Sequence, residues 1–133
     1  MRKKNEARRF ARWCFSKLNL RPIPICYAPA PALIDPNGNH CFGCYTYDIE
    51  EPAWKSKIWV AYNQRNTVVL LGTIAHEIWH YYQKTQGIID TMDPEKMENE
   101  AQEAAEHLVA LWLIRGGFVP TKEGKEYVLD RKV

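Results

Sequence analysis

Two histidines and a glutamate stand close together near the middle of the chain, in the segment His76-Glu-Ile-Trp-His80. Because His76 and His80 are four residues apart, a helix would place their side chains on one face, one turn apart. Two imidazoles so placed can bind one Zn²⁺ ion at about 2.0–2.1 Å. Glu77 would point to the side, where its carboxylate can reach a metal-bound water without blocking the metal. The spacing therefore predicts a zinc site with an adjacent general base.

Apolar periodicity predicts a helix around this motif over about 67–86, with Asn66 as its cap and Gly87 as its stop. On a helical wheel, one side of this segment carries Val69, Thr73, His76, His80 and Gln83. The broad opposite side carries Val68, Leu71, Ile74, Ala75, Ile78, Trp79 and Tyr82. The core therefore has its own apolar stripe, and the two histidines are not needed to fill it.

A second long helix, rich in glutamate, is expected after this one. Asp93-Pro94-Glu95 predicts its start, because Asp caps a helix, Pro fits the first turn and Glu complements the dipole. Gly116-Gly117 predicts its end. Its buried side is expected to hold Met97, Ala101, Ala104, Ala105, Leu108, Val109, Leu111 and Trp112. Its polar side is expected to hold Lys96, Asn99, Glu100, Glu103, Glu106 and His107.

A catalytic zinc ion usually takes three protein ligands, so a third ligand is expected on the glutamate-rich helix. Glu98 falls within the buried side of that helix, where a carboxylate is costly unless it is paired or bound to a cation. We therefore predict Glu98 as the third zinc ligand, with Glu103 and His107 as the alternatives.

The segment His76-Glu-x-x-His80, followed by Glu98-x-Glu100-Ala101, resembles the gluzincin pattern of zinc metallopeptidases. It is most similar to the minimal gluzincins and to the ImmA/IrrE-type metallopeptidases of bacteria and mobile elements. The resemblance covers about residues 20–112 and implies a zincin-like α+β fold. It also implies that His76, His80 and Glu98 bind one zinc ion and that Glu77 is the general base. The implied activity is hydrolysis of peptide bonds in a peptide or protein substrate.

The chain also departs from this pattern. The position four residues after the ligand glutamate is often Asp or Asn in the family, and here it is Gln102. Glutamine can still hydrogen-bond a ligand, although it supplies no charge. The aromatic residue usual two positions further on is Ala104, which favours a neighbouring branch of the family, either phage-borne or uncharacterised. The continuation Tyr81-Tyr82-Gln83 resembles SprT-like, DNA-associated proteases, which use a third histidine and would make His107 the ligand.

The resemblance implies a mechanism in which zinc lowers the pKa of its water and Glu77 takes the proton as that water attacks a carbonyl. A further donor would stabilise the oxyanion. The candidates are Tyr45, Tyr47, Tyr62 and Tyr81, of which Tyr81 directly follows the motif. The resemblance also implies that an edge strand at 58–62, with Trp59, Val60 and Ala61, holds the substrate as an added strand.

The remaining segments complete a single α+β domain over residues 1–133 with a small twisted mixed sheet. An amphipathic helix is predicted at 5–18, within a basic N-terminal segment at 1–20. The other elements are expected at 21–27 (an edge strand, because Pro22 and Pro24 cannot donate), 28–39 (a loop), 41–48 and 57–62 (strands).

The charge is unevenly distributed although the net charge is only +2. Eight of the 18 basic residues lie in the first 21 positions, where Glu6 is the one acid. The simpler interpretation is the solvated face of a helix, and the alternative is a weak contact with nucleic acid. No apolar run is long enough for a membrane span, and Arg8, Arg9 and Arg12 interrupt any signal peptide, so we expect a cytoplasmic protein without membrane contact.

Two further features leave alternatives open. Cys41-Phe-Gly-Cys44 has the spacing of a metal or redox pair, but a second such pair is lacking, so two reduced thiols on a strand are the simpler interpretation. The tail at 118–133 is predicted either to dock away from the cleft as a short helix or to cover the cleft. In the second case Glu123, Glu126 or Asp130 would reach the metal.

Overall fold

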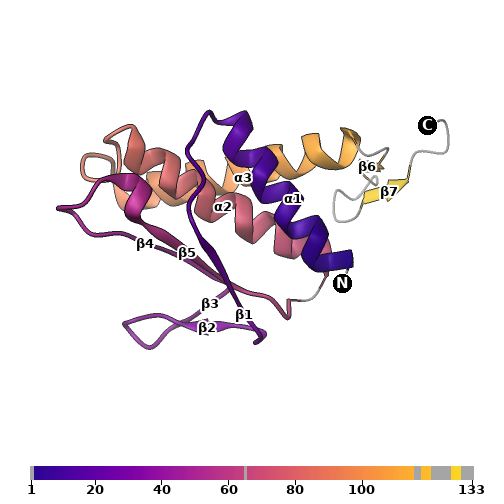
Figure 1. Ribbon diagram of the computed structural model, residues 1–133, viewed down its shortest axis with the longest axis horizontal. Coiled ribbons are helices and arrows are strands. Elements are labelled where there is room, and N and C mark those ends of the chain that lie inside the picture. Colours follow the sequence, from indigo (N-terminus) through magenta and orange to yellow (C-terminus); the bar gives the residue numbers. More distant parts are fainter. Residues whose placement is uncertain (1, 65, 116–117, 121–126, 130–133) are drawn as a thin grey trace.

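The computed structural model describes residues 2–64, 66–115, 118–120 and 127–129 (Figure 1). Three long helices dominate this part of the chain, and short strands form small sheets beside them. The helices are α1 (Arg2–Lys17), α2 (Thr67–Thr85) and α3 (Pro94–Arg115). The predicted α+β class is confirmed. No helix among the described residues has the length and apolar character needed to cross a membrane.

The main sheet is mixed, as predicted, and has the strand order β1-β5-β4. Its strands are β1 (Ile25–Ala28), β5 (Lys57–Ala61) and β4 (Gly43–Thr46). β1 runs parallel to β5, and β4 runs antiparallel to it. β1 lies at one edge, as Pro22 and Pro24 indicated.

The prediction that residues 58–62 form an edge strand is wrong. β5 is the central strand, because β1 pairs with one side of it and β4 pairs with the other. Ile58, Val60 and Ala61 are fully buried, which favours the middle of the sheet for this apolar strand. The second edge of the sheet is therefore β4.

The predicted loop at 28–39 contains a short strand, β2 (Leu33–Ile34), which pairs with β3 (His40–Cys41). Asp35 closes the turn between them, because its Oδ1 accepts hydrogen bonds of 2.9 Å from the backbone N–H groups of Asn37 and Asn39. The predicted strand at 41–48 is thus divided into β3 and β4 by Phe42. A 3₁₀ turn, η1 (Ala53–Lys55), connects β4 to β5.

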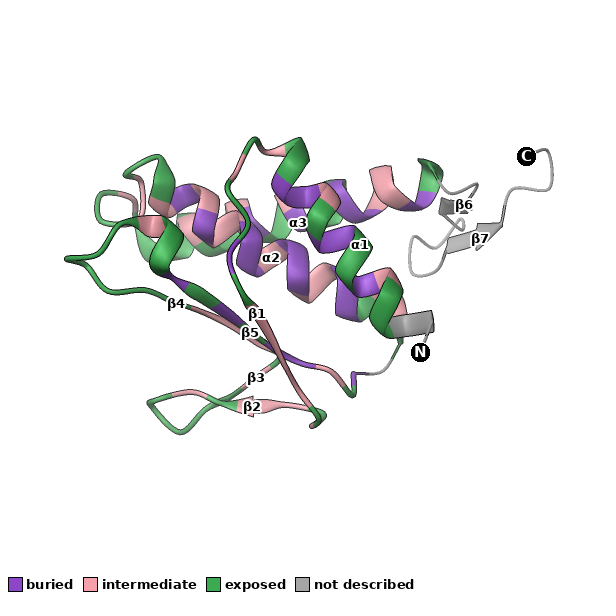
Figure 2. Ribbon diagram, in the orientation of Figure 1, coloured by how far each residue is buried: buried purple, intermediate pink, exposed green. Residues whose placement is uncertain are grey.

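α2 is the central helix, and it packs against α1, α3 and the sheet. Asn66 caps it through a 2.9 Å hydrogen bond from the N–H of Val69, as predicted. Figure 2 shows the buried residues gathered where these elements face one another. The core includes Phe10, Cys14, Ile58, Val60, Leu70, Leu71, Ile74, Ala75 and Ile78, all fully buried. The predicted apolar side of α2 is confirmed at its centre, from Leu71 to Ile78, whereas Leu70 and Tyr81 are buried without having been assigned to it.

α3 begins at Pro94 and ends at Arg115, close to the predicted limits. It is held against α1 by a hydrogen bond of 2.8 Å from Trp112 Nε1 to Glu6 Oε1. The ring of Trp112 also packs edge-on against Phe10. α1 thus fixes the outer end of α3, while the first turns of α3 lie against the C-terminal half of α2.

The tail contains two short strands, β6 (Phe118–Pro120) and β7 (Tyr127–Leu129), which pair antiparallel. The expected terminal helix is therefore wrong for these six positions. β6 follows the end of α3, and the 18 residues from Glu98 to Arg115 span about 25 Å of helix, so the two ends of this segment lie far apart. Glu123, Glu126 and Asp130, proposed to reach the metal, lie outside the described residues.

Candidate metal centre

Three side chains from two helices converge on one point. The Nε2 atom of His76 lies 2.9 Å from Oε2 of Glu98, and the Nε2 atom of His80 lies 3.0 Å from Oε1 of the same carboxylate. The two Nε2 atoms are 3.2 Å apart. Within the described part of the chain, this is the one group of three or more His, Cys, Asp or Glu side chains close enough to hold a metal ion. α2 supplies both imidazoles, and α3 supplies the carboxylate.

Glu98 reaches the histidines from an exposed position. Its side chain is 62% exposed, so the expectation that it lies on the buried side of α3 is wrong. Glu98 lies near the start of α3, where its side chain reaches His76 and His80 along the surface of the protein. A helical wheel of α3 alone contains no information on the position of α2. The alternatives Glu103 and His107 lie elsewhere, beside a separate surface groove that includes Trp79.

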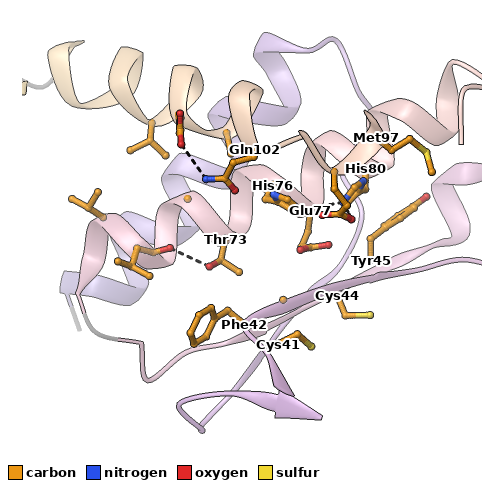
Figure 3. Close-up of a pocket in the computed structure, with 18 of the residues that line it drawn as sticks. Cys41, Phe42, Cys44, Tyr45, Thr73, His76, Glu77, His80, Met97 and Gln102 are labelled. Atoms are coloured by element: carbon orange, nitrogen blue, oxygen red, sulfur yellow. Dashed lines mark hydrogen bonds and ion pairs between the residues drawn. The ribbon is translucent and has the colours of Figure 1, made fainter. Parts of the chain in front are cut away.

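Glu77 lies beside His76 and His80, between α2 and strand β4 (Figure 3). Its side chain is buried, and burial together with the nearby charge of Glu98 raises its pKa to about 8. A hydrogen bond from the backbone N–H of Tyr45 partly opposes this rise. The carboxylate is therefore close to the candidate metal ligands without being one of them.

Burial is the main cause that lowers the pKa of His76, and His80 adds to it. Hydrogen bonds to Glu98 and Gln102 act in the opposite direction. The amide of Gln102 also donates to Glu106 Oε1 at 3.1 Å. Gln102 thus lies next to a histidine of the cluster, where the sequence placed it.

The cluster opens into a cavity of about 990 Å³. α2 and α3 form one side of it, and the chain from Cys41 to Tyr45 forms the other, as the labelled side chains in Figure 3 show. Apolar side chains from Phe42, Val68, Val69, Ala105 and Val109 line part of the wall. The edge strand β4, and not β5, therefore borders the cleft.

Gly43 allows β4 to approach α2 closely. A Cβ atom at this position would lie 2.7 Å from Cγ2 of Thr73 and 3.0 Å from Cγ of Glu77, both far inside normal contact distance. The glycine thus sets the width of the cleft at the candidate base. Sequence reasoning missed this role, although an isolated glycine in a strand is a signal of close backbone approach.

The candidate substrate-binding residues on β5 do not line the cavity. Val60 and Ala61 are fully buried, and Trp59, which alternates with them, is 41% exposed on the other face of the sheet. Their predicted contact with a substrate is therefore not supported.

The candidate oxyanion donors are scattered. Tyr81 is buried in the core, and its hydroxyl donates to the backbone oxygen of Arg21 at 2.7 Å, away from the cavity. Tyr62 packs edge-on against Tyr27. Tyr45 and Tyr47 do line the cavity, but the hydroxyl of Tyr45 is buried. Tyr81, named from its position after the motif, is therefore not supported as a donor.

Cys41 and Cys44 are half-buried free thiols on the cavity wall. Burial raises the pKa of both, and the charge of Glu77 contributes. In the described residues they belong to no group of three metal-ligating side chains. The two thiols lie on neighbouring strands, β3 and β4, and not on one strand as predicted.

A hydrogen-bonded group beneath the histidines was not predicted. Nδ1 of His80 lies 2.8 Å from Oε1 of Gln83, and Nε2 of Gln83 lies 3.1 Å from the backbone oxygen of Met97. Glu100, expected on the polar side of α3, is half-buried and accepts a 2.8 Å hydrogen bond from Trp79 Nε1. The three-residue spacing between His80 and Gln83 was the available signal.

We expect Gly43→Ala to destabilise the protein by about 1–3 kcal/mol, because the added methyl group overpacks the contact between β4 and α2. Gly72→Ala is the matched control, because a Cβ there meets nothing within 4 Å. It should stabilise the helix by about 0.5–1 kcal/mol. Urea unfolding measures both changes. Equal stabilities of Gly43→Ala and the parent would contradict the close approach.

Comparison of the chain with protein-family models, with curated proteins and with solved structures gave no match.

Proposed function

We propose that this chain is a zinc-dependent peptidase with a zincin-like, gluzincin-type site. The observation that carries the proposal is the convergence of His76, His80 and Glu98 beside the buried carboxylate of Glu77. A site that only holds a metal for stability has no use for that second carboxylate. Its position at the wall of an open cavity supports a role in chemistry.

The donor set fits zinc. Two imidazole nitrogens and one carboxylate oxygen are the ligands of several catalytic zinc sites, which keep a fourth position for water or substrate. All three ligand atoms lie within 4.8 Å of one another, a spacing that a single ion can bridge. When bound, zinc supplies Lewis acidity that makes a water nucleophilic near neutral pH and polarises a carbonyl.

Glu77 is suited to move the proton in this reaction. It would take a proton from the attacking water and pass it to the leaving amine. The backbone N–H of Tyr45 donates to its carboxylate and so fixes the orientation of the side chain. Gly43, which faces it from β4, leaves the space between helix and strand in which the side chain lies.

The substrate proposed for this cleft is an extended peptide lying along β4. β4 is an edge strand that borders the cavity, so its outer backbone groups can pair with an added strand. Phe42, Val69 and Val109 on the wall favour a substrate with an apolar side chain near the cleaved bond. This proposal moves the substrate-binding strand from β5 to β4.

We expect one zinc ion per chain. His76→Ala and Glu98→Ala should each lose stoichiometric zinc, because each removes one of three ligands. His107→Ala and Glu103→Ala are matched controls from α3 outside the cluster, and they should keep it. Metal analysis after dialysis, with folding checked by circular dichroism, measures the outcome. Full zinc content in His76→Ala would refute the assignment.

Glu77→Gln should keep zinc and lower peptide hydrolysis by about 10²–10⁴-fold, because the amide cannot accept the proton. Turnover of an unstructured protein substrate, measured beside zinc content, checks this expectation. The rival function is a metal-binding partner protein with little or no turnover. A parent chain that binds zinc but cleaves no peptide, with no difference from Glu77→Gln, would favour that rival.

A second candidate function rests on the exposed face of α1. Lys4, Arg8 and Arg12 are exposed at four-residue spacing, and among the described residues none of them forms an ion pair. The acid Glu6 is engaged by Arg9 and by Trp112. The apolar side chains Ala7, Phe10, Ala11, Cys14 and Phe15 are buried, so this face offers charge without apolar anchors. That favours a phosphate backbone over a lipid surface.

If α1 contacts DNA, a short duplex should bind with an affinity that falls steeply with salt. Replacing Lys4, Arg8 and Arg12 with Ala should lessen the log–log slope by about 0.9 per lost phosphate contact. Replacing Lys55, Lys57 and Lys96 with Ala gives a control with the same charge change elsewhere. Fluorescence anisotropy at several salt concentrations measures the slopes. Equal slopes for both triple variants would exclude α1 as the contact.

A further inference from the structure

Gln83 is a polar side chain with no access to solvent. It is 0% exposed, one turn beyond His80 on the same side of α2. Its amide has three neighbours: Nδ1 of His80 at 2.8 Å, the backbone oxygen of Met97 at 3.1 Å and Oε1 of Glu100 at 3.3 Å. A buried amide is stable only if its groups are hydrogen-bonded, so these contacts determine how the side chain is oriented.

The chemistry of the neighbours fixes the two ends of the amide. The backbone oxygen of Met97 and the carboxylate of Glu100 can only accept hydrogen bonds, so the –NH₂ group of Gln83 must face them. Glu100 is itself held by the indole N–H of Trp79 at 2.8 Å. The carbonyl oxygen of Gln83 must therefore face His80.

An amide oxygen can only accept, so Nδ1 of His80 must carry a proton. In the neutral ring the lone pair is then on Nε2, the atom that points toward Glu98 and His76. We propose that Gln83 is a positioning residue that sets the tautomer and the ring orientation of His80 for metal binding. This inference rests on the proposed function in one respect, namely that the ligand of the unprotonated Nε2 atom of His80 is zinc.

The same amide also reaches the second helix of the site. Met97, whose backbone oxygen it binds, directly precedes Glu98 in α3. Gln83 thus links the histidine from α2 to the backbone beside the carboxylate ligand from α3. One buried side chain therefore helps to fix the positions of His80 and Glu98, two of the three candidate ligands, relative to each other.

The proton position is tested first in the metal-free parent. Long-range ¹H–¹⁵N spectra of the imidazoles at pH 8 distinguish the two tautomers, and we expect His80 to be protonated on Nδ1. A proton on Nε2 would overturn the inference, whether or not any variant folds. This measurement does not depend on zinc, so a parent chain that bound no zinc would refute the proposed function and leave the tautomer to be decided by the spectra.

The second test uses Gln83→Met, which is close in size and apolar, and so suits a fully buried position. Zinc affinity, measured by competition with a chelator, should fall by about 10–100-fold. Gln86→Met, an exposed glutamine just beyond α2, is the matched control and should bind zinc as the parent does. A folded Gln83→Met protein with the parent's affinity would overturn the inference.

A charge-neutral exchange separates positioning from packing. In the double variant Gln83→Glu/Glu100→Gln, the carboxylate at position 83 still accepts from His80 and the amide at position 100 can donate to it, but the backbone oxygen of Met97 loses its donor. The tautomer of His80 in the metal-free chain should therefore remain Nδ1-protonated. A folded double variant with His80 protonated on Nε2 would contradict a role through His80.

Discussion

The packing of α3 against α2 is the contact on which the whole candidate site depends. Neither helix carries three metal ligands, and the exposed carboxylate of Glu98 meets His76 and His80 only because the first turns of α3 pack against the C-terminal half of α2. The contact is fixed on both sides of the cluster. Gln83 binds α3 beneath the histidines, and Trp112 binds Glu6 of α1 near the far end of α3.

The second constraint is the short distance between strand β4 of the sheet and helix α2. β4 lies so close to α2 that no side chain fits at Gly43, and Glu77 is buried in the resulting space. The same closeness gives Glu77 a backbone hydrogen bond from Tyr45. The candidate base is thus positioned by the edge strand, while the candidate ligands are positioned by the helices. An extended substrate bound along β4 would lie between these two sets of residues.

The polar groups in and beneath the cluster illustrate how a buried site is kept ordered. Gln83 hydrogen-bonds to His80 and to the backbone of Met97, and Glu100 accepts a hydrogen bond from Trp79. An unpaired polar group in such a place would cost about 1–3 kcal/mol. These contacts therefore favour one arrangement of the two helices over others that would bury the same apolar surface.

Local sequence determined the elements and the residue types of the site. Asn66, Asp93 and Pro94 define helix starts through short-range hydrogen bonds and backbone geometry, and the four-residue spacing of His76 and His80 follows from helical periodicity alone. Only tertiary structure decided that Glu98 meets the histidines from an exposed position, that β5 is central, and that Gly43 and Gln83 support the site. A helical wheel describes one helix in isolation. Strand order, cleft width and hydrogen bonds between helices depend on how separate elements pack, which no local pattern encodes.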